Sequence, residues 1–120
     1  MKKLIFQILT LISLVNAKNI DEIFHNANLH MEKEKYTEAV KTYKSIMNFQ
    51  PLRSEIFYNL GNAYYRLDSL GLALWAYSKA NLISPRNEDA KYNLNLVNDK
   101  LIGDIRLPNS IFFQKIYRTI

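Results

Sequence analysis

Apolar and small residues recur in a fixed order between Ser54 and Asn87, and the order predicts two short amphipathic helices joined by a turn at Leu67–Leu70. Bulky and small side chains alternate along this stretch, which reads Phe57, Leu60, Gly61, Tyr64, Ala73, Tyr77, Ala80 and Pro85. We expect the small residues to let the helix backbones approach each other while the aromatic rings fill the surrounding space. Pro85 should end the second helix, because proline lacks an N–H donor and restrains the residue before it.

A second copy of the pattern lies upstream, between Asp21 and Arg53. The shift that aligns Phe24 with Tyr58 also aligns Ala27 with Gly61, Asn28 with Asn62, Ala39 with Ala73, Tyr43 with Tyr77, Ile46 with Ala80 and Pro51 with Pro85. The turn of this copy is predicted at residues 34–37. The copy departs from the pattern at Asn26 and His30, where Leu and Tyr would be usual, and we expect looser packing in a first repeat because one of its sides has no neighbour.

A partial third copy starts at Glu88. Applied once more, the same shift aligns Tyr58, Asn59 and Leu60 with Tyr92, Asn93 and Leu94. This predicts one further helix over about residues 88–102, which Gly103 would end. Because no second Ala–aromatic–Ala–Pro series follows, we expect this helix to cap the second repeat.

The order of these residues resembles the tetratricopeptide repeat (TPR), whose signature has a bulky residue, Leu-Gly, Tyr, Ala, an aromatic residue, Ala and Pro, and whose period is about 34 residues. The shift between the copies equals that period. A generic amphipathic hairpin would need small and large residues in alternation, but not in this register. The resemblance implies an all-α helix-turn-helix solenoid over residues 18–103, with repeats at about 20–53 and 54–87 and a capping helix. It also implies a scaffold that binds a protein or peptide partner.

Residues 1–17 are typical of a secretory signal peptide. Lys2 and Lys3 precede an apolar run from Leu4 to Val15, and Val15-Asn16-Ala17 supplies small residues for a cleavage site. The run is short for a transmembrane helix. The alternatives are a buried amphipathic N-terminal helix and an uncleaved membrane anchor, and export is the interpretation we favour.

The last residues, 104–120, form a tail. Leu107-Pro108-Asn109 indicates a loop, and apolar residues with interspersed Lys115 and Arg118 follow it. Three interpretations stay open: a short helix folded back on the repeats, an amphipathic segment at a membrane surface, and the start of a membrane-proximal region of a longer protein.

A narrower resemblance rests on the leader, the run YNLGNAYY at residues 58–65 and the helix after Pro85. Together with Ala27-Asn28, Asn93-Leu94 and the Asp104-Ile105 and Pro108 tail, they make the chain similar to the periplasmic TPR protein of Bat aerotolerance operons. The resemblance implies a scaffold in the cell envelope, beside membrane proteins with von Willebrand A-type domains. Members of that family usually continue into membrane-spanning and SH3-like segments, whereas this sequence ends at residue 120.

Composition narrows the function classes. The chain has 48% hydrophobic residues, which suffices for a packed core, and no cysteine, which removes disulfides and thiolate chemistry. Of 16 basic residues, Lys2 and Lys3 lie in the leader, so the mature chain carries 14 against 11 acidic residues, a charge of +3 rather than +5. The basic residues form no run, so we expect no nucleic-acid partner. No motif for catalysis, a metal or a cofactor is present, and we expect a non-enzyme.

In TPR proteins the first helix of each repeat lines a concave groove. The corresponding slots hold Asp21, Phe24, Asn28, Met31 and Glu32 in the first copy, Glu55, Tyr58, Asn59, Asn62, Tyr65 and Arg66 in the second, and Asp89, Tyr92, Asn93, Leu96, Asp99 and Lys100 in the third. Our candidate partner-binding residues are Asn28, Tyr58, Asn59, Asn62, Tyr65, Arg66, Tyr92 and Asn93. Spaced amides can hold the backbone of an extended peptide, and tyrosines offer flat amphipathic contact area.

The alternative role for these asparagines is to cap or brace neighbouring helices. The basic clamp of chaperone-binding TPR proteins is missing, because Phe24 and Tyr58 occupy its position, so we do not expect recognition of an acidic chain terminus. Two further functional hypotheses stay open: a structural assembly or membrane-associated piece that uses the tail, and a cytosolic adaptor if the N-terminus is not cleaved.

Overall fold

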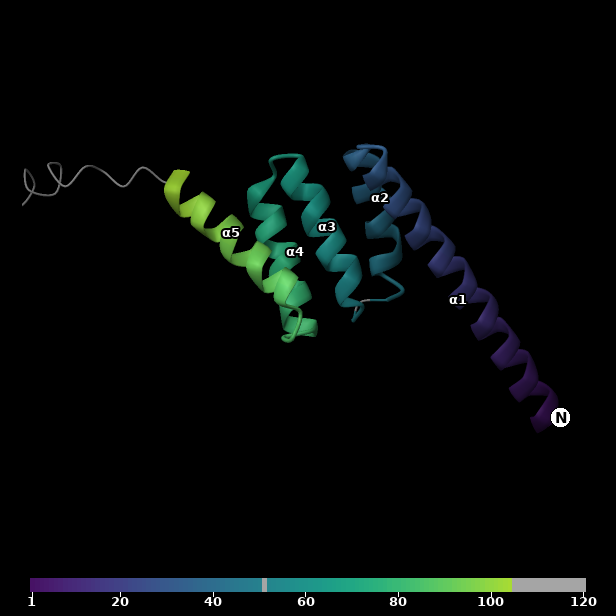
Figure 1. Ribbon diagram of the computed structural model, residues 1–120. Helices are drawn as coiled ribbons and strands as arrows, with labels where there is room; N and C mark the ends of the chain where they lie inside the picture. The colour runs from purple at the N-terminus through teal and green to yellow at the C-terminus, as the bar shows by residue number, and fades with distance from the viewer. Residues whose placement is uncertain (51, 105–120) are drawn as a thin grey trace, which may run out of the picture.

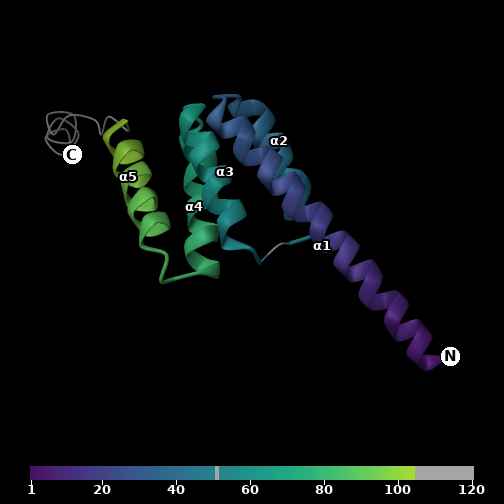
Figure 2. The ribbon, with the colours of Figure 1, turned by 45° about the vertical axis from the view of Figure 1, so that its right-hand side comes forward.

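The chain folds into a row of antiparallel helices (Figures 1 and 2). The structure is a computed structural model that describes residues 1–50 and 52–104, apart from the side chains of residues 16–18 and 104. The helices are α1 (Lys2–Glu32), α2 (Tyr36–Met47), α3 (Ser54–Arg66), α4 (Leu70–Ile83) and α5 (Glu88–Asp104). Each packs against the next along the chain, and within the described residues no strand occurs. The predicted all-α helix-turn-helix solenoid is therefore confirmed.

The signature positions form the core, as the pattern predicted. The buried members are Ala39, Tyr43, Phe57, Leu60, Gly61, Tyr64, Ala73, Tyr77 and Ala80. Ala80 shares a small cluster with Phe57 and with Ala90 of α5, so its small side chain does leave room for the helix that follows. Helix α4 ends at Ile83, directly before Ser84 and Pro85, which confirms the predicted stop.

The two repeats also share their internal aromatic contacts. The ring centroids of Phe24 and Tyr43 lie 5.9 Å apart in the first repeat, and those of the equivalent Tyr58 and Tyr77 lie 6.1 Å apart in the second. Both pairs are tilted rather than stacked, as the quadrupoles of aromatic rings favour. Residues one sequence period apart therefore make equivalent ring contacts in the two repeats.

The turn inside each repeat uses a left-handed residue that is not glycine. Glu34 and Asp68, at equivalent positions of the two copies, both have φ of 56°. The backbone N–H of the next residue reaches back to a helix carbonyl, Lys35 to His30 at 2.8 Å and Ser69 to Tyr64 at 2.9 Å, so each turn closes its helix in a Schellman motif.

Helix α1 joins the leader to the first repeat without a break. Residues 1–33 contain neither Gly nor Pro, so nothing in the sequence interrupts the helix. Side chains from Leu4 to Val15 are exposed, and contact with the core begins at Ile20. By length and composition, α1 is able to cross a membrane, a property that signal sequences share. The alternative of a buried N-terminal helix is therefore wrong for Leu4–Val15.

Helix α5, which packs on α4, has a well-capped N-terminus. The Asn87 side chain accepts a hydrogen bond from the Ala90 N–H at 3.0 Å, and Glu88 and Asp89 follow in the first turn, where the helix dipole favours acidic residues. The predicted end at about Ile102, before Gly103, is wrong by two residues, because the helix continues through Gly103 to Asp104. Glycine lowers helix stability but does not by itself break a helix.

The face of α5 where a further helix would pack is polar. Asn95 and Asn98 stand where α3 has Gly61 and Tyr64, and both asparagines are exposed. A further helix packed on this face would have to bury these two amides. The expectations for Pro51, for Asp104's side chain and for the tail at residues 105–120 lie outside the described residues.

Removal of residues 1–17 should leave the repeats as stable as before, because Ile20 is the first residue that packs on the core. Urea unfolding of a chain that starts at Lys18 should give a free energy within about 0.5 kcal/mol of the full chain. A chain that starts at Phe24 also loses Ile20, Ile23 and the ion pair of Asp21 with Arg53, and it should lose about 2 kcal/mol or more. Equal losses in the two truncations would contradict this.

Candidate functional site

Two asparagine–tyrosine triads connect the first helices of successive units. In the first triad the Asn28 Oδ1 accepts hydrogen bonds from the Tyr43 hydroxyl at 2.5 Å and from Asn59 Nδ2 at 3.1 Å. In the second, the Asn62 Oδ1 accepts from the Tyr77 hydroxyl at 2.7 Å and from Asn93 Nδ2 at 3.3 Å. Each member of one triad lies one repeat period from its counterpart in the other.

The triads show that bracing of neighbouring helices, which we had kept as an alternative, is one role of these asparagines. Asn28 and Asn59 join α1 to α3, and Asn62 and Asn93 join α3 to α5. The tyrosine of each triad comes from the second helix of the repeat and is buried. The amides therefore fix the spacing and the orientation of α1, α3 and α5 relative to one another.

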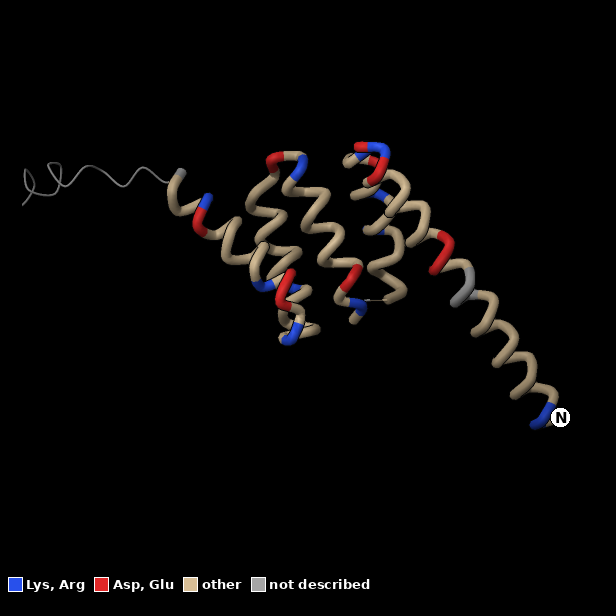
Figure 3. Tube along the Cα trace, in the orientation of Figure 1, with Lys and Arg blue, Asp and Glu red and all other residues tan. Residues whose placement is uncertain are grey.

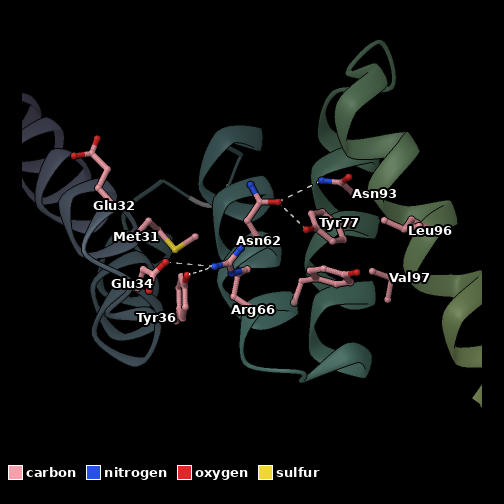
Figure 4. A pocket seen from close by; sticks show the side chains of 11 residues that line it. Met31, Glu32, Glu34, Tyr36, Asn62, Arg66, Tyr77, Asn93, Leu96 and Val97 are labelled. Atoms are coloured by element: carbon pink, nitrogen blue, oxygen red, sulfur yellow. Dashed lines mark hydrogen bonds and ion pairs between the residues drawn. The ribbon is translucent and has the colours of Figure 1, made fainter.

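Each triad leaves two amide groups over. Among the described residues, no hydrogen bond uses Nδ2 of Asn28 or Asn62, or Oδ1 of Asn59 or Asn93. All four side chains are partly exposed. The remaining groups alternate donor, acceptor, donor, acceptor from α1 to α5, and an extended peptide backbone offers the same alternation. Figure 4 shows the Asn62 oxygen turned to Tyr77 and Asn93, with its nitrogen on the other side.

A pocket of about 440 Å³ lies beside the second triad. Its lining comes from all five helices and from the turn between α1 and α2, and consists of Met31, Glu32, Glu34, Tyr36, Asn62, Tyr65, Arg66, Tyr77, Asn93, Leu96 and Val97. Met31 stands on one side and Leu96 and Val97 on the other, with the polar groups between them (Figure 4). The pocket can therefore hold apolar side chains at two ends and a polar backbone in the middle.

A cation closes one side of this pocket. The Arg66 guanidinium donates to the Tyr36 hydroxyl at 2.5 Å, stands 5.0 Å from the centroid of that ring and lies 3.7 Å from the Glu34 carboxylate. Lys100 and Asp68 form the equivalent ion pair, also at 3.7 Å, one repeat later. These pairs are exposed and add little stability, so their main effect is to hold the charged side chains in place at the groove rim.

The structure places the candidate residues in three groups. Asn62, Tyr65, Arg66 and Asn93 line the pocket. Asn28 and Asn59 form the first triad outside the pocket lining, and Tyr58 packs its ring on Tyr77. Tyr92 is exposed on α5 and does not line the pocket.

Sequence reasoning missed the contribution to the pocket of Glu34, in the first turn, and of Tyr36. The turn predicted at residues 34–37 is also wrong in its second half, because α2 begins at Tyr36. Glu34 and Tyr36 line the pocket although they lie outside the helix slots that we considered, and Tyr77 was assigned to the core alone. The signal was present in the period, because Glu34 aligns with Asp68 and Arg66 with Lys100. An acidic residue and a basic residue that both recur after one repeat point to an ion pair between repeats.

Burial changes the ionisation of both triad tyrosines. Removal from water raises the pKa of Tyr43 to about 12, and the nearby Asn59 amide lowers it only in part. Burial likewise raises the pKa of Tyr77, and the neighbouring Tyr58 adds to the rise. Both hydroxyls therefore stay protonated into the alkaline range, where an exposed tyrosine would ionise, and act as donors to Asn28 and Asn62.

Alkaline pH should unfold the repeats through these tyrosines. The unfolded chain ionises Tyr43 near pH 10 and the folded chain only near pH 12, so stability is complete below about pH 10 and falls as the pH rises towards 12, by about 3 kcal/mol for this residue. Circular dichroism with urea at a series of pH values measures the loss. Tyr43→Phe should make the decline shallower, and an unchanged slope in that variant would contradict the assignment.

Comparison with protein families supports the same fold. A family model described as "TPR repeat" matches residues 27–68, which extend from the end of α1 to the turn after α3. Comparison with curated proteins gave no match. Within the described residues, no group of three or more His, Asp or Glu side chains stands close enough to hold a metal ion.

Proposed function

We propose that the protein binds an extended peptide segment of a partner protein along the concave face of α1, α3 and α5. The premise is the TPR repeat, which is typical of protein-interaction scaffolds. The main support for this proposal is that the amide donors and acceptors left unused on Asn28, Asn59, Asn62 and Asn93 alternate along this face. Backbone recognition of this kind tolerates different side chains. The pocket beside Asn62 then selects one of them by size and polarity.

The scaffold is held rigid before it binds. The triads use the amide atoms that face the helices, so the outward atoms are oriented without help from a ligand. Less conformational entropy is then lost on binding. Tyr65 and Arg66 supply flat surface in the pocket lining, and aromatic residues and arginine are the types that contribute most to affinity at interfaces.

The cell envelope is the proposed location. The basic and then apolar leader supports export, and the resemblance to the periplasmic TPR protein of Bat operons supports the same compartment. Membrane proteins with von Willebrand A-type domains are the partners that this resemblance suggests. Mass spectrometry of the N-terminus in cell fractions tests the location: a start at Lys18 or an intact Met1 in the envelope agrees with it, and an intact chain in the cytosol contradicts it.

Substitution inside the groove should weaken peptide binding. Peptides selected from a random display library on the chain that starts at Lys18 serve as probes. Leu96→Glu places a charge in the pocket and should weaken the selected peptides by about tenfold or more, since a buried apolar contact is replaced by a carboxylate. Fluorescence anisotropy measures the dissociation constants.

Leu72→Glu is the matched control. Leu72 is also an exposed helical leucine, but it lies beside Trp75 in a different depression of the surface. We expect it to change affinity less than about twofold, which is the scale of a few tenths of a kcal/mol. Equal effects of the two substitutions would reject the concave groove as the binding surface. The asparagines are unsuitable for this test, because their replacement also removes the triads.

A further inference from the structure

Beyond the leader, the three most exposed large apolar side chains in the described residues gather at one edge of the solenoid. Leu52 is 80% exposed, Phe49 74% and Leu82 72%. Phe49 and Leu52 lie in the connection between α2 and α3, and Leu82 lies in the last turn of α4, before the connection to α5. Because the helices are antiparallel, both connections lie at the same edge (Figure 1), which we call the leader edge.

The leader emerges from this edge. The Arg53 guanidinium, next to Leu52, lies 3.0 Å from the Asp21 carboxylate of α1 and 4.5 Å from the centroid of the Phe24 ring. The α2–α3 connection is thus fixed to α1 at the base of the exposed leader. The hydroxyl of Ser54 donates to the Ala80 carbonyl at 3.0 Å, which fixes the start of α3 to the end of α4. These contacts link Leu52 and Leu82 to the part of α1 that directly follows the leader.

For the chain that keeps its leader, we propose that the leader edge lies on a lipid bilayer into which the leader, Leu4 to Val15, inserts, with Phe49, Leu52 and Leu82 immersed in the bilayer interface. The leader is part of the same helix as the first repeat, and that helix is long and apolar enough to cross a membrane. A bilayer that holds the leader therefore meets the solenoid at this edge first. Exposed phenylalanine and leucine side chains are the kind that bury in an interface.

The opposite edge is different in character. Its two turns, residues 33–35 and 67–69, are polar except for Leu67, which is 39% exposed. The end of α5 also lies at this edge (Figure 1) and adds Ile102, which is 56% exposed, so the opposite edge is less apolar than the leader edge. Near the leader edge, basic and acidic residues both occur (Figure 3). Arg53 and Arg86 lie in the two connections at this edge, and Glu55 lies in the first turn of α3. Attraction to the bilayer should therefore come from apolar contact rather than from charge, and it should not need anionic lipid.

The cysteine-free chain allows a direct test by single-site labelling. Single cysteines that replace Phe49, Leu52 or Leu82 are labelled with an environment-sensitive fluorophore in the full chain, which is then reconstituted into phosphatidylcholine vesicles that contain a spin-labelled lipid quencher. Leu9→Cys reports insertion of the leader. Lys35→Cys and Leu67→Cys report the opposite edge, and circular dichroism verifies that each variant folds.

The proposal predicts a blue shift and lipid quenching for probes at 9, 49, 52 and 82, no change for probes at 35 and 67, and the same result in high salt. It is overturned if the probe at 9 enters the lipid while those at 49, 52 and 82 stay in water, an outcome that leaves this edge to a protein partner. It is equally overturned if the probe at 9 stays in water. Since no probe lies in the concave groove, failure here says nothing against peptide binding.

Discussion

Gly61→Val should destabilise the repeats by about 4 kcal/mol, the largest effect we expect from a single substitution. A Cβ built on Gly61 would stand 2.6 Å from Cε1 and 2.7 Å from Cδ1 of the Tyr77 ring, well inside van der Waals contact. The ring is only 2% exposed, and its hydroxyl is held by Asn62 at 2.7 Å, so it cannot turn away. Urea unfolding followed by circular dichroism measures the loss.

Gly61→Ala should cost less, about 1–2 kcal/mol. The first repeat has Ala27 at the equivalent position, fully buried in the same core as Tyr43, so a methyl group is compatible with this packing after a small shift of the helices. The higher helix propensity of alanine offsets part of the strain. Valine adds two further carbon atoms against the ring, and no position of the first repeat shows a precedent for them.

Gly71→Ala is the matched control for the helix propensity. Nothing lies within 4 Å of a Cβ at Gly71, which is exposed in the first turn of α4. This substitution should be neutral or should stabilise the protein by up to about 1 kcal/mol. If Gly61→Val and Gly71→Ala changed the free energy of unfolding alike, close approach of α3 to the Tyr77 ring could not be the reason for Gly61.

The fold could be predicted because its physical basis is local and repeated. Gly61 is small enough to pack against the Tyr77 ring, and Ala80 is small enough to leave room for the next helix. Because the sequence repeats, equivalent contacts occur in both copies. The end of α4 followed in the same way from Pro85, whereas the turn predicted at Leu67–Leu70 is one residue shorter, because α4 begins at Leu70. The amphipathic prediction for α4 was less good. Its only charged residue is Lys79, and it exposes Leu72, Trp75 and Leu82.

The role of the asparagines could be predicted only in part. The recurrence of Asn28 as Asn62 one period later indicates a shared task, but the sequence does not say which amide atom faces the helices. That depends on a tyrosine of the next helix, whose hydroxyl reaches the amide only after two helices have packed. Groove lining by Glu34 was unpredictable for a similar reason, because a left-handed residue at that turn is usually glycine or asparagine.

Asn62→Ala should lower the free energy of unfolding by about 3 kcal/mol. The substitution leaves the Tyr77 hydroxyl without its acceptor in a site that is 2% exposed, and an unsatisfied buried hydroxyl costs about 1–3 kcal/mol. It also removes the bond from Asn93 Nδ2, at 3.3 Å, which joins α3 to α5. Thermal unfolding should show the same loss as a fall of the midpoint by roughly 10–20 °C for a domain of this size.

A double-mutant cycle with Tyr77→Phe separates the hydroxyl from the rest of the effect. Phenylalanine keeps the ring against Gly61 but needs no acceptor, so Tyr77→Phe alone should cost about 1 kcal/mol. In that background Asn62→Ala should cost about 1–2 kcal/mol less than in the parent chain, which is the coupling energy of the pair.

Asn98→Ala, at an exposed position of α5, is the control and should change the free energy of unfolding by no more than about 0.5 kcal/mol. If instead the costs of Asn62→Ala and Tyr77→Phe simply added, the hydrogen bond between them would carry no stability. The triads would then position the groove amides without holding the repeats together, and the loss in Asn62→Ala would have to come from the Asn93 bond alone.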